Sequence, residues 1–107
     1  MSDPTIAATK LRLLTIVSEA ILEDRLVRDI LAAGATGYTV VRAHGQGSRE
    51  TRASALGGNV RIEVVLGEAV EHEILTKLAR DYFPNYAVIA WVQAVDVVRG
   101  SKYTRAS

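Results

Sequence analysis

The residues best suited to bind a ligand lie in one stretch, 44–58, which has no regular hydrophobic pattern and holds four of the chain's eight glycines. Gly45 and Gly47 allow the backbone to turn successive N–H groups toward one point, which is the geometry of an anion nest. Ser48 adds a hydroxyl donor, and Arg49 adds a guanidinium group that can hold a phosphate or carboxylate through two hydrogen bonds. The stretch therefore suits a phosphate or another small oxyanion.

A solvated hairpin tip would have much the same composition, so the residue types alone leave both interpretations open. The stretch is not a Walker loop, because no Gly-Lys-Ser/Thr follows the glycines, and it does not match a dinucleotide fingerprint. Its length favours function or disorder, since structureless loops of this size are uncommon within compact domains. His44, at the root of the stretch, could also donate to an anion.

Other kinds of chemistry find little support in the sequence. His72 stands between Glu71 and Glu73 on the polar side of a predicted helix, and this triplet lacks the further ligands that a metal would need, so we expect a surface histidine. No Ser/His/Asp arrangement or paired carboxylate set is evident. The absence of cysteine excludes disulfides and thiolate chemistry. We predict neither an enzyme nor a cofactor or metal site.

Length and composition indicate one small domain with a substantial core, since the chain has 107 residues of which 49% are hydrophobic. Its net charge of +1 lacks the basic excess that nucleic-acid binding normally requires. Residues 1–9 do not resemble a signal peptide, and no apolar stretch approaches the roughly 20 residues that span a bilayer. We therefore expect a cytoplasmic protein that does not bind nucleic acid.

The hydrophobic pattern predicts the elements that must position the 44–58 stretch. A strand over 10–17 leads to a helix with Ser18 as its N-cap, and Gly34 ends this helix in the left-handed conformation of a C′ residue. The apolar stripe of this helix consists of Leu22, Leu26 and Ile30, with Val27 and Leu31 beside it. The later elements are strands at 38–41 and 60–66, a helix at 70–82 and a strand at 86–98.

This order, β-α-β-β-α-β, predicts an α+β ferredoxin-like sandwich. We divide the chain into a mobile leader (1–9), the domain (10–98) and a C-terminal tail (99–107). The unbroken apolar run 88–92, with Trp91 interpreted as core, and the adjacent pair Leu13-Leu14 indicate that both faces of the sheet need cover. Two helices can cover only one face, so we expect a symmetric homo-oligomer.

Two motifs resemble those of a known family. Residues 34–41, Gly-Ala-Thr-Gly-Tyr-Thr-Val-Val, followed by residues 45–49, Gly-Gln-Gly-Ser-Arg, are similar to the corresponding stretches of PII-like signalling proteins, most closely the carboxysome-associated PII (CPII) and SbtB group. The element order extends this resemblance over 11–98. It implies a homotrimer with an adenine nucleotide between subunits, and 44–58 would be the family's T-loop, which orders over the phosphates.

The resemblance also implies which residues meet the ligands. Those expected at the nucleotide are Gly34, Ala35, Thr36, Gly37, Tyr38, Thr39, Gly45, Gly47, Ser48, Arg49 and, from the adjacent chain, Arg99. Those expected at bicarbonate are Gly47, Ser48 and Arg49.

Departures from the family pattern narrow the implied function. Ordinary PII proteins hold a triphosphate with a glycine-rich, lysine-bearing loop before the last strand, whereas residues 83–86, Phe-Pro-Asn-Tyr, offer neither residue type. The chain also lacks the C-terminal cysteine pair of many SbtB proteins. The remaining features resemble those of a sensor of adenine nucleotide and bicarbonate in inorganic-carbon metabolism. ADP or AMP is the implied nucleotide, and ATP is a weaker candidate. The alternative is a nucleotide-dependent regulatory subunit of a bicarbonate transporter, and the implied partner is a carboxysome or transporter component.

Overall fold

A computed structural model describes residues 6–44 and 58–100 of the chain. Its elements, in order, are β1 (Ala8–Glu19), a short 3₁₀ helix η1 (Ala20–Leu22), α1 (Glu23–Ala32), β2 (Thr39–Ala43), β3 (Asn59–Leu66), α3 (Glu68–Asp81) and β4 (Ile89–Val98). Apart from the one-turn η1, this is the predicted β-α-β-β-α-β order of a ferredoxin-like fold. No helix in the two described ranges is long and apolar enough to cross a membrane.

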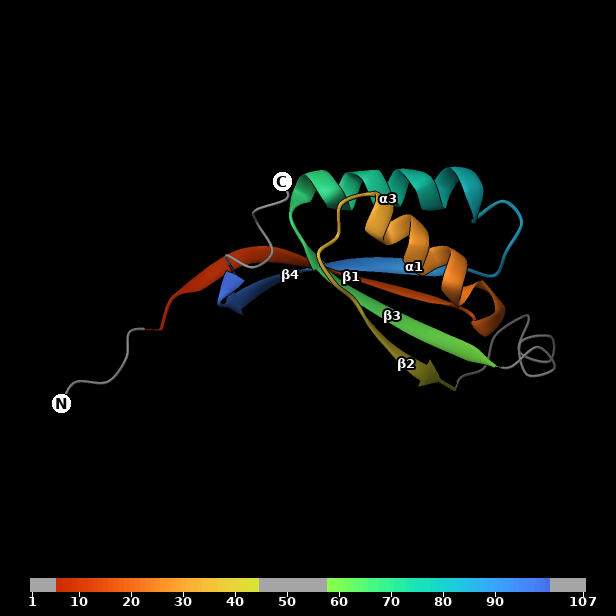
Figure 1. Cartoon of the computed structure of the whole chain (residues 1–107), viewed down its shortest axis with the longest axis horizontal. Helices are drawn as coiled ribbons and strands as arrows, with labels where there is room; N and C mark the ends of the chain where they lie inside the picture. Colours follow the sequence, from red (N-terminus) through yellow and green to blue (C-terminus); the bar gives the residue numbers. More distant parts are fainter. Residues whose placement is uncertain (1–5, 45–57, 101–107) are drawn as a thin grey trace.

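The four strands form one antiparallel sheet in the order β2-β3-β1-β4, and both helices lie on the same face of it (Figure 1). Successive side chains of a strand point to opposite faces, so the register assigns each residue to one side. Leu14 of β1 is paired with Val64 of β3 and with Val92 of β4, and all three face the helices. The fully or largely buried core lies there and consists of Leu14, Ile16, Leu22, Leu26, Ile30, Val60, Ile62, Val64, Leu66, Val70, Ile74, Leu78, Tyr82 and Val88.

The first helix starts later than the sequence predicted. Ser18 is not an N-cap but a buried strand residue paired with Val60, and β1 continues to Glu19. The chain then turns through η1, and α1 begins at Glu23 without a side-chain cap. Strand pairing prevails over the capping preference of serine because β1 is a central strand with hydrogen-bonded neighbours on both sides. The predicted stripe of Leu22, Leu26 and Ile30 is buried.

The starts of β1 and β4 also differ from the prediction. β1 begins at Ala8 rather than Lys10, because Ala8 and Thr9 are paired with Val98 and Val97 of β4. β4 begins at Ile89 rather than at residue 86, because the preceding residues form a turn in which the Tyr86 N–H donates to the Tyr82 carbonyl (2.9 Å).

The face of the sheet that the helices leave uncovered, termed the open face, has apolar residues beside polar ones. By register it carries Val41 of β2, Arg61, Glu63 and Val65 of β3, Leu13 and Val17 of β1, and Ile89 and Trp91 of β4. Ile89 is 58% and Trp91 44% exposed, so the interpretation of Trp91 as a core residue is wrong for the single chain. The cause is geometric: the run 88–92 supplies both faces of β4, and only Val88, Ala90 and Val92 pack toward the helices.

Strands β1 and β4 extend past the rest of the sheet. Their pairing begins at Ala8 and Val98, whereas β1 meets β3 only from Arg12 onward. Residues 8–11 and 95–98 therefore form a two-stranded projection, termed the arm, which Figure 1 shows reaching away from the helical layer. At about 3.3 Å per residue, the arm extends roughly 13 Å beyond β3.

Candidate functional site

The turn between α1 and β2 carries the first group of predicted site residues. It begins with two backbone hydrogen bonds at the end of α1. The Gly34 N–H donates to the Leu31 carbonyl (3.1 Å), and the Ala35 N–H donates to the Ile30 carbonyl (3.3 Å). This is the Schellman motif, and Gly34 has the left-handed φ of 111° that the motif requires. The predicted role of Gly34 as a C′ residue is confirmed.

The rest of the turn is accessible. Thr36, Tyr38 and Thr39 are exposed, and Gly37 is half-buried. An added Cβ at Gly37 would meet no atom within 4 Å, and its φ lies outside the left-handed region. Neither space nor backbone conformation in the described chain therefore explains a glycine at this position.

Strand β2, which follows the turn, is an edge strand and borders two charged residues. Thr39 and Val41 stand on the open face opposite Glu63 and Arg61 of β3, respectively. Glu63 is half-buried and Arg61 is exposed. Beside the turn, the open face thus offers a hydroxyl, a carboxylate and a guanidinium group.

The predicted T-loop joins β2 to β3, as expected. Its ends are fixed by the pairing of Ala43 with Asn59, and by Gly58, whose φ is 82° and whose carbonyl accepts a hydrogen bond from the Ala20 N–H (2.8 Å). The anion-binding residues predicted within it lie outside the described part of the chain and stay predictions: Gly45, Gly47, Ser48 and Arg49.

Arg99 is the last of the predicted site residues and follows directly on the arm. Along the sheet, Thr39 is in line with Glu63, Thr15 and Trp91 through successive strand pairs. Arg99 lies eight residues beyond Trp91, which corresponds to about 26 Å along the strand direction. Within one chain, Thr39 and Arg99 are therefore too far apart to hold the same ligand.

The connection from α3 to β4 is fixed by a cluster that the sequence did not predict. The Arg25 guanidinium lies 4.6 Å from the Tyr82 ring centroid and 5.6 Å from that of Tyr86, and it donates to the Tyr86 hydroxyl (3.2 Å). The Tyr82 hydroxyl donates to the Asp29 carboxylate. Burial and this hydrogen bond raise the pKa of Tyr82, so the tyrosine stays a donor. The sequence shows only that Arg25 and Asp29 are four residues apart and that Tyr82 and Tyr86 are four residues apart. This spacing does not reveal that the two pairs contact each other.

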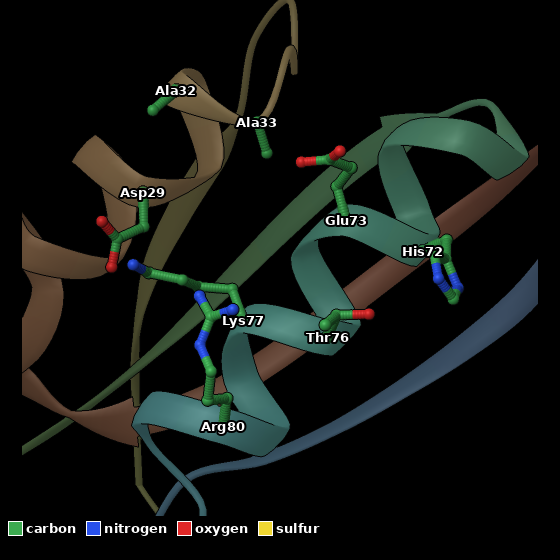
Figure 2. Close-up of a pocket in the computed structure, with 8 residues that line it drawn as sticks. All are labelled: Asp29, Ala32, Ala33, His72, Glu73, Thr76, Lys77 and Arg80. Carbon is green, nitrogen blue, oxygen red and sulfur yellow. The ribbon is translucent and has the colours of Figure 1, made fainter.

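A groove of about 450 Å³ lies between α1 and α3, on the side of the molecule away from the open face (Figure 2). Its two cations are already paired, because Lys77 and Arg80 contact Asp81 at 2.9 Å and 3.0 Å. Hydrogen bonds from Arg80 and then Lys77 lower the pKa of Asp81 to about 2. His72 also lines the groove and is exposed, and the described residues contain no group of three side chains that could hold a metal. This groove includes none of the predicted site residues.

Comparison with known proteins identifies the fold family. The family model for the nitrogen regulatory protein P-II matches residues 11–102, which is most of the chain. The chain belongs to the PII family. It is 46% identical to a PII-like signalling protein from Thermus thermophilus, with a TM-score of 0.79 over 91% of this chain and 98% of that one. It is therefore a PII-like signalling protein rather than an enzyme.

More distant structures share the fold. CPII from Thiomonas intermedia K12, in a structure bound to ADP, AMP and bicarbonate, is 19% identical, with a TM-score of 0.76 over 90% of this chain and 99% of that one. GlnK of B. subtilis, in complex with ATP, is 15% identical, with a TM-score of 0.60 over 80% of this chain and 82% of that one. Both of these PII proteins thus bind adenine nucleotides.

Proposed function

We propose that this PII-like protein is a homotrimeric sensor of ADP or AMP and of bicarbonate, and that the ligands act by ordering the T-loop, residues 44–58. The observation that carries the proposal is that the single chain supplies only parts of a site. Thr39, which follows the accessible α1–β2 turn, and Arg99 are about 26 Å apart along the strand direction. The exposed apolar residues of the open face favour contact with further copies. Assembly would bring the turn of one copy beside the arm of another.

The open face gives the energetic reason for assembly. Ile89, Trp91 and Val41 are 58%, 44% and 38% exposed in the single chain. Full burial of a large apolar side chain is worth about 1.5–3 kcal/mol, so covering even these three favours association strongly. Closed cyclic symmetry covers the same face in every copy.

The connection between α3 and β4 supports a nucleotide with fewer than three phosphates. Residues 83–86 contain neither glycine nor lysine, and the contacts of Arg25 with Tyr82 and Tyr86 tie this connection to α1. It therefore offers no flexible backbone and no cation for a third phosphate. ADP and AMP, which the distant relative CPII binds together with bicarbonate, are the ligands we expect.

Bicarbonate would bind beside the phosphates through Gly47, Ser48 and Arg49. Each ligand would lower the ordering cost that the other must meet, so the two should bind cooperatively, with a coupling of about 1–3 kcal/mol. This assignment places the protein with CPII and SbtB in inorganic-carbon signalling.

Calorimetric titration with ADP, in buffers with and without bicarbonate and at matched pH and ionic strength, tests the proposal. We expect ADP to bind to a trimer, and to bind roughly tenfold more tightly with bicarbonate present. Equal affinities in both buffers would remove bicarbonate from the function, and no ADP binding at all would refute the nucleotide site.

The variant Arg49→Ala tests the T-loop assignment. It should lower the affinity for ADP by roughly tenfold or more, because charge-assisted hydrogen bonds contribute about 1.5–3 kcal/mol. It should leave the affinity for adenosine unchanged. Arg28→Ala, at an exposed position in α1, serves as the control and should bind both ligands like the wild type. If Arg49→Ala weakened adenosine as much as ADP, Arg49 would support the loop without contacting phosphate.

A further inference from the structure

The end of the arm has an unusual backbone. Arg99 has a φ of 72°, and among the described residues it is the only one other than glycine with a positive φ. A side chain with a Cβ adopts this left-handed conformation at a cost, and it persists only where the surrounding structure enforces it. Something at the end of β4 must therefore hold Arg99 in place.

The next residue supplies the restraint. Gly100 is buried, and a Cβ added to it would lie 2.3 Å from Thr9 Cβ, 2.6 Å from Thr9 Oγ1 and 3.1 Å from Thr9 Cγ2. The φ of Gly100 is not in the left-handed region, so this position needs glycine for space alone. The chain beyond β4 thus folds back against β1 at the one point where a missing side chain lets it approach.

Thr9 is itself firmly held. It belongs to β1 and is paired with Val97 of β4, while its neighbour Ala8 is paired with Val98. The last strand pairs of the arm thus fix the Thr9 backbone. Gly100 packs on the Thr9 side chain, and Arg99, between Val98 and Gly100, takes the left-handed conformation that brings Gly100 there.

We propose that Thr9 and Gly100 are positioning residues for Arg99. Their contact fixes the point and direction in which the arginine leaves the arm, so that its guanidinium meets the phosphates bound to a neighbouring copy without first having to be ordered. The inference rests on the proposed function, because it assumes that Arg99 contacts phosphate, and it adds two residues that do not touch the ligand themselves.

The test compares ADP with adenosine, which lacks phosphates, on the full-length protein by calorimetry. Arg99→Ala should lower the affinity for ADP about tenfold, since a charge-assisted hydrogen bond is lost. It should change the affinity for adenosine by less than about twofold. Gly100→Ala should reproduce this selective loss, weakening ADP at least about threefold, because the new methyl group pushes the chain off Thr9 and releases Arg99.

A second variant tests the contact itself. In the double variant Thr9→Gly/Gly100→Ala the obstructing side chain is gone, and since Gly100 has no left-handed φ, alanine is tolerated there. Thr9→Gly itself removes the contact and should weaken ADP binding, so the double variant should match the ADP affinity of the Thr9→Gly single variant within about twofold. If Gly100→Ala does not fold, the double variant should still fold and bind ADP like Thr9→Gly.

The outcomes separate the two proposals. If wild type fails to bind ADP, or if Arg99→Ala binds it unchanged, the function assigned to Arg99 is wrong and this inference is lost with it. If Arg99→Ala is selectively impaired but Gly100→Ala is not, only the positioning role is overturned. The positioning role is also overturned if Gly100→Ala weakens the binding of ADP and adenosine equally, or if the double variant binds ADP more weakly than Thr9→Gly. In either case the contact would be merely structural.

Discussion

At the scale of single residues, the two glycines of the α1–β2 turn illustrate two different reasons for a glycine. Gly34 is required by its own backbone, since its φ of 111° closes the Schellman motif at the end of α1. Gly37 has no such requirement, and an added Cβ would meet no atom within 4 Å. In our proposal the free space at Gly37 belongs to the nucleotide or to a neighbouring copy.

The two glycines should therefore respond oppositely to alanine. Gly34→Ala should lower the free energy of unfolding by about 1–2 kcal/mol, because alanine disfavours the left-handed conformation. Gly37→Ala should leave stability unchanged or raise it by up to about 1 kcal/mol, yet weaken ADP binding. Denaturant unfolding and calorimetry measure the two effects, and unchanged ADP binding in Gly37→Ala would remove this residue from the site.

The hydroxyls of Tyr82 and Tyr86 provide a second residue-level comparison. Tyr82 is fully buried and donates to the Asp29 carboxylate, whereas half-buried Tyr86 accepts from Arg25. Tyr82→Phe should cost about 1.5–3 kcal/mol, because it leaves a carboxylate without its donor, and Tyr86→Phe about 0.5–1.5 kcal/mol. Urea unfolding of both variants tests this order, and a larger loss in Tyr86→Phe would contradict it.

At the scale of elements, the helices are held to the sheet by the core, and α3 is also held to it by an ion pair. The Arg12 guanidinium of β1 contacts both carboxylate oxygens of Glu71 in α3, at 3.0 Å and 3.3 Å. At the other end of α3, Lys77 and Arg80 contact the Asp81 carboxylate within the helix itself. Each end of this helix thus has a charge contact of its own.

The contact at Asp81 predicts a dependence of stability on pH. Its pKa is lowered to about 2 in the folded protein, against about 3.9 for an unfolded chain. The stabilisation is therefore complete above about pH 4 and is lost as the pH falls through about 2. Asp81→Asn should melt below wild type at pH 6, and the difference in melting temperature should shrink as the pH approaches 2; a constant difference would rule out the ionised contact.

The sequence predicted the elements better than their limits. The β-α-β-β-α-β order, the end of α1 at Gly34 and the 44–58 connection all followed from short-range patterns. The prediction of Ser18 as an N-cap was wrong because the preference of serine for this position is a local effect. The pairing of Ser18 with Val60 depends on a strand distant in the sequence. The Arg25–Tyr82–Tyr86 cluster joins residues about sixty positions apart, and no local pattern reports such contacts. The apolar run around Trp91 predicted cover on both faces of the sheet. The structure shows the helices on one face and Trp91 exposed on the other, so the cover of the open face stays a prediction.

At the scale of the whole molecule, the helices and the open face divide the exposed apolar residues into two kinds. Leu31 and Trp91 are almost equally exposed, at 45% and 44%. Leu31 belongs to the helical layer, where single apolar residues at the surface are ordinary. Trp91 belongs, with Ile89, to the open face, which we expect to be buried in the trimer.

This difference makes the two residues a matched pair. Trp91→Lys should convert the trimer to monomers, because a charge would have to be buried in the interface, whereas Leu31→Lys should leave it intact. Sedimentation velocity gives the mass of each variant, and circular dichroism checks that both are folded. A trimer that survived Trp91→Lys would mean that assembly uses another face.

The hairpin that carries the T-loop has a consequence for how such a protein can change its partner over evolution. Its two ends meet in a fixed strand pair, Ala43 with Asn59, and Gly58 is bonded to the start of η1. The entropy of closing a loop grows only with the logarithm of its length, about 0.6 kcal/mol for each doubling. Insertions, deletions and wholesale replacement between these anchors therefore leave the stability of the domain almost untouched. New recognition sequences can be tried there while the sheet and helices stay the same.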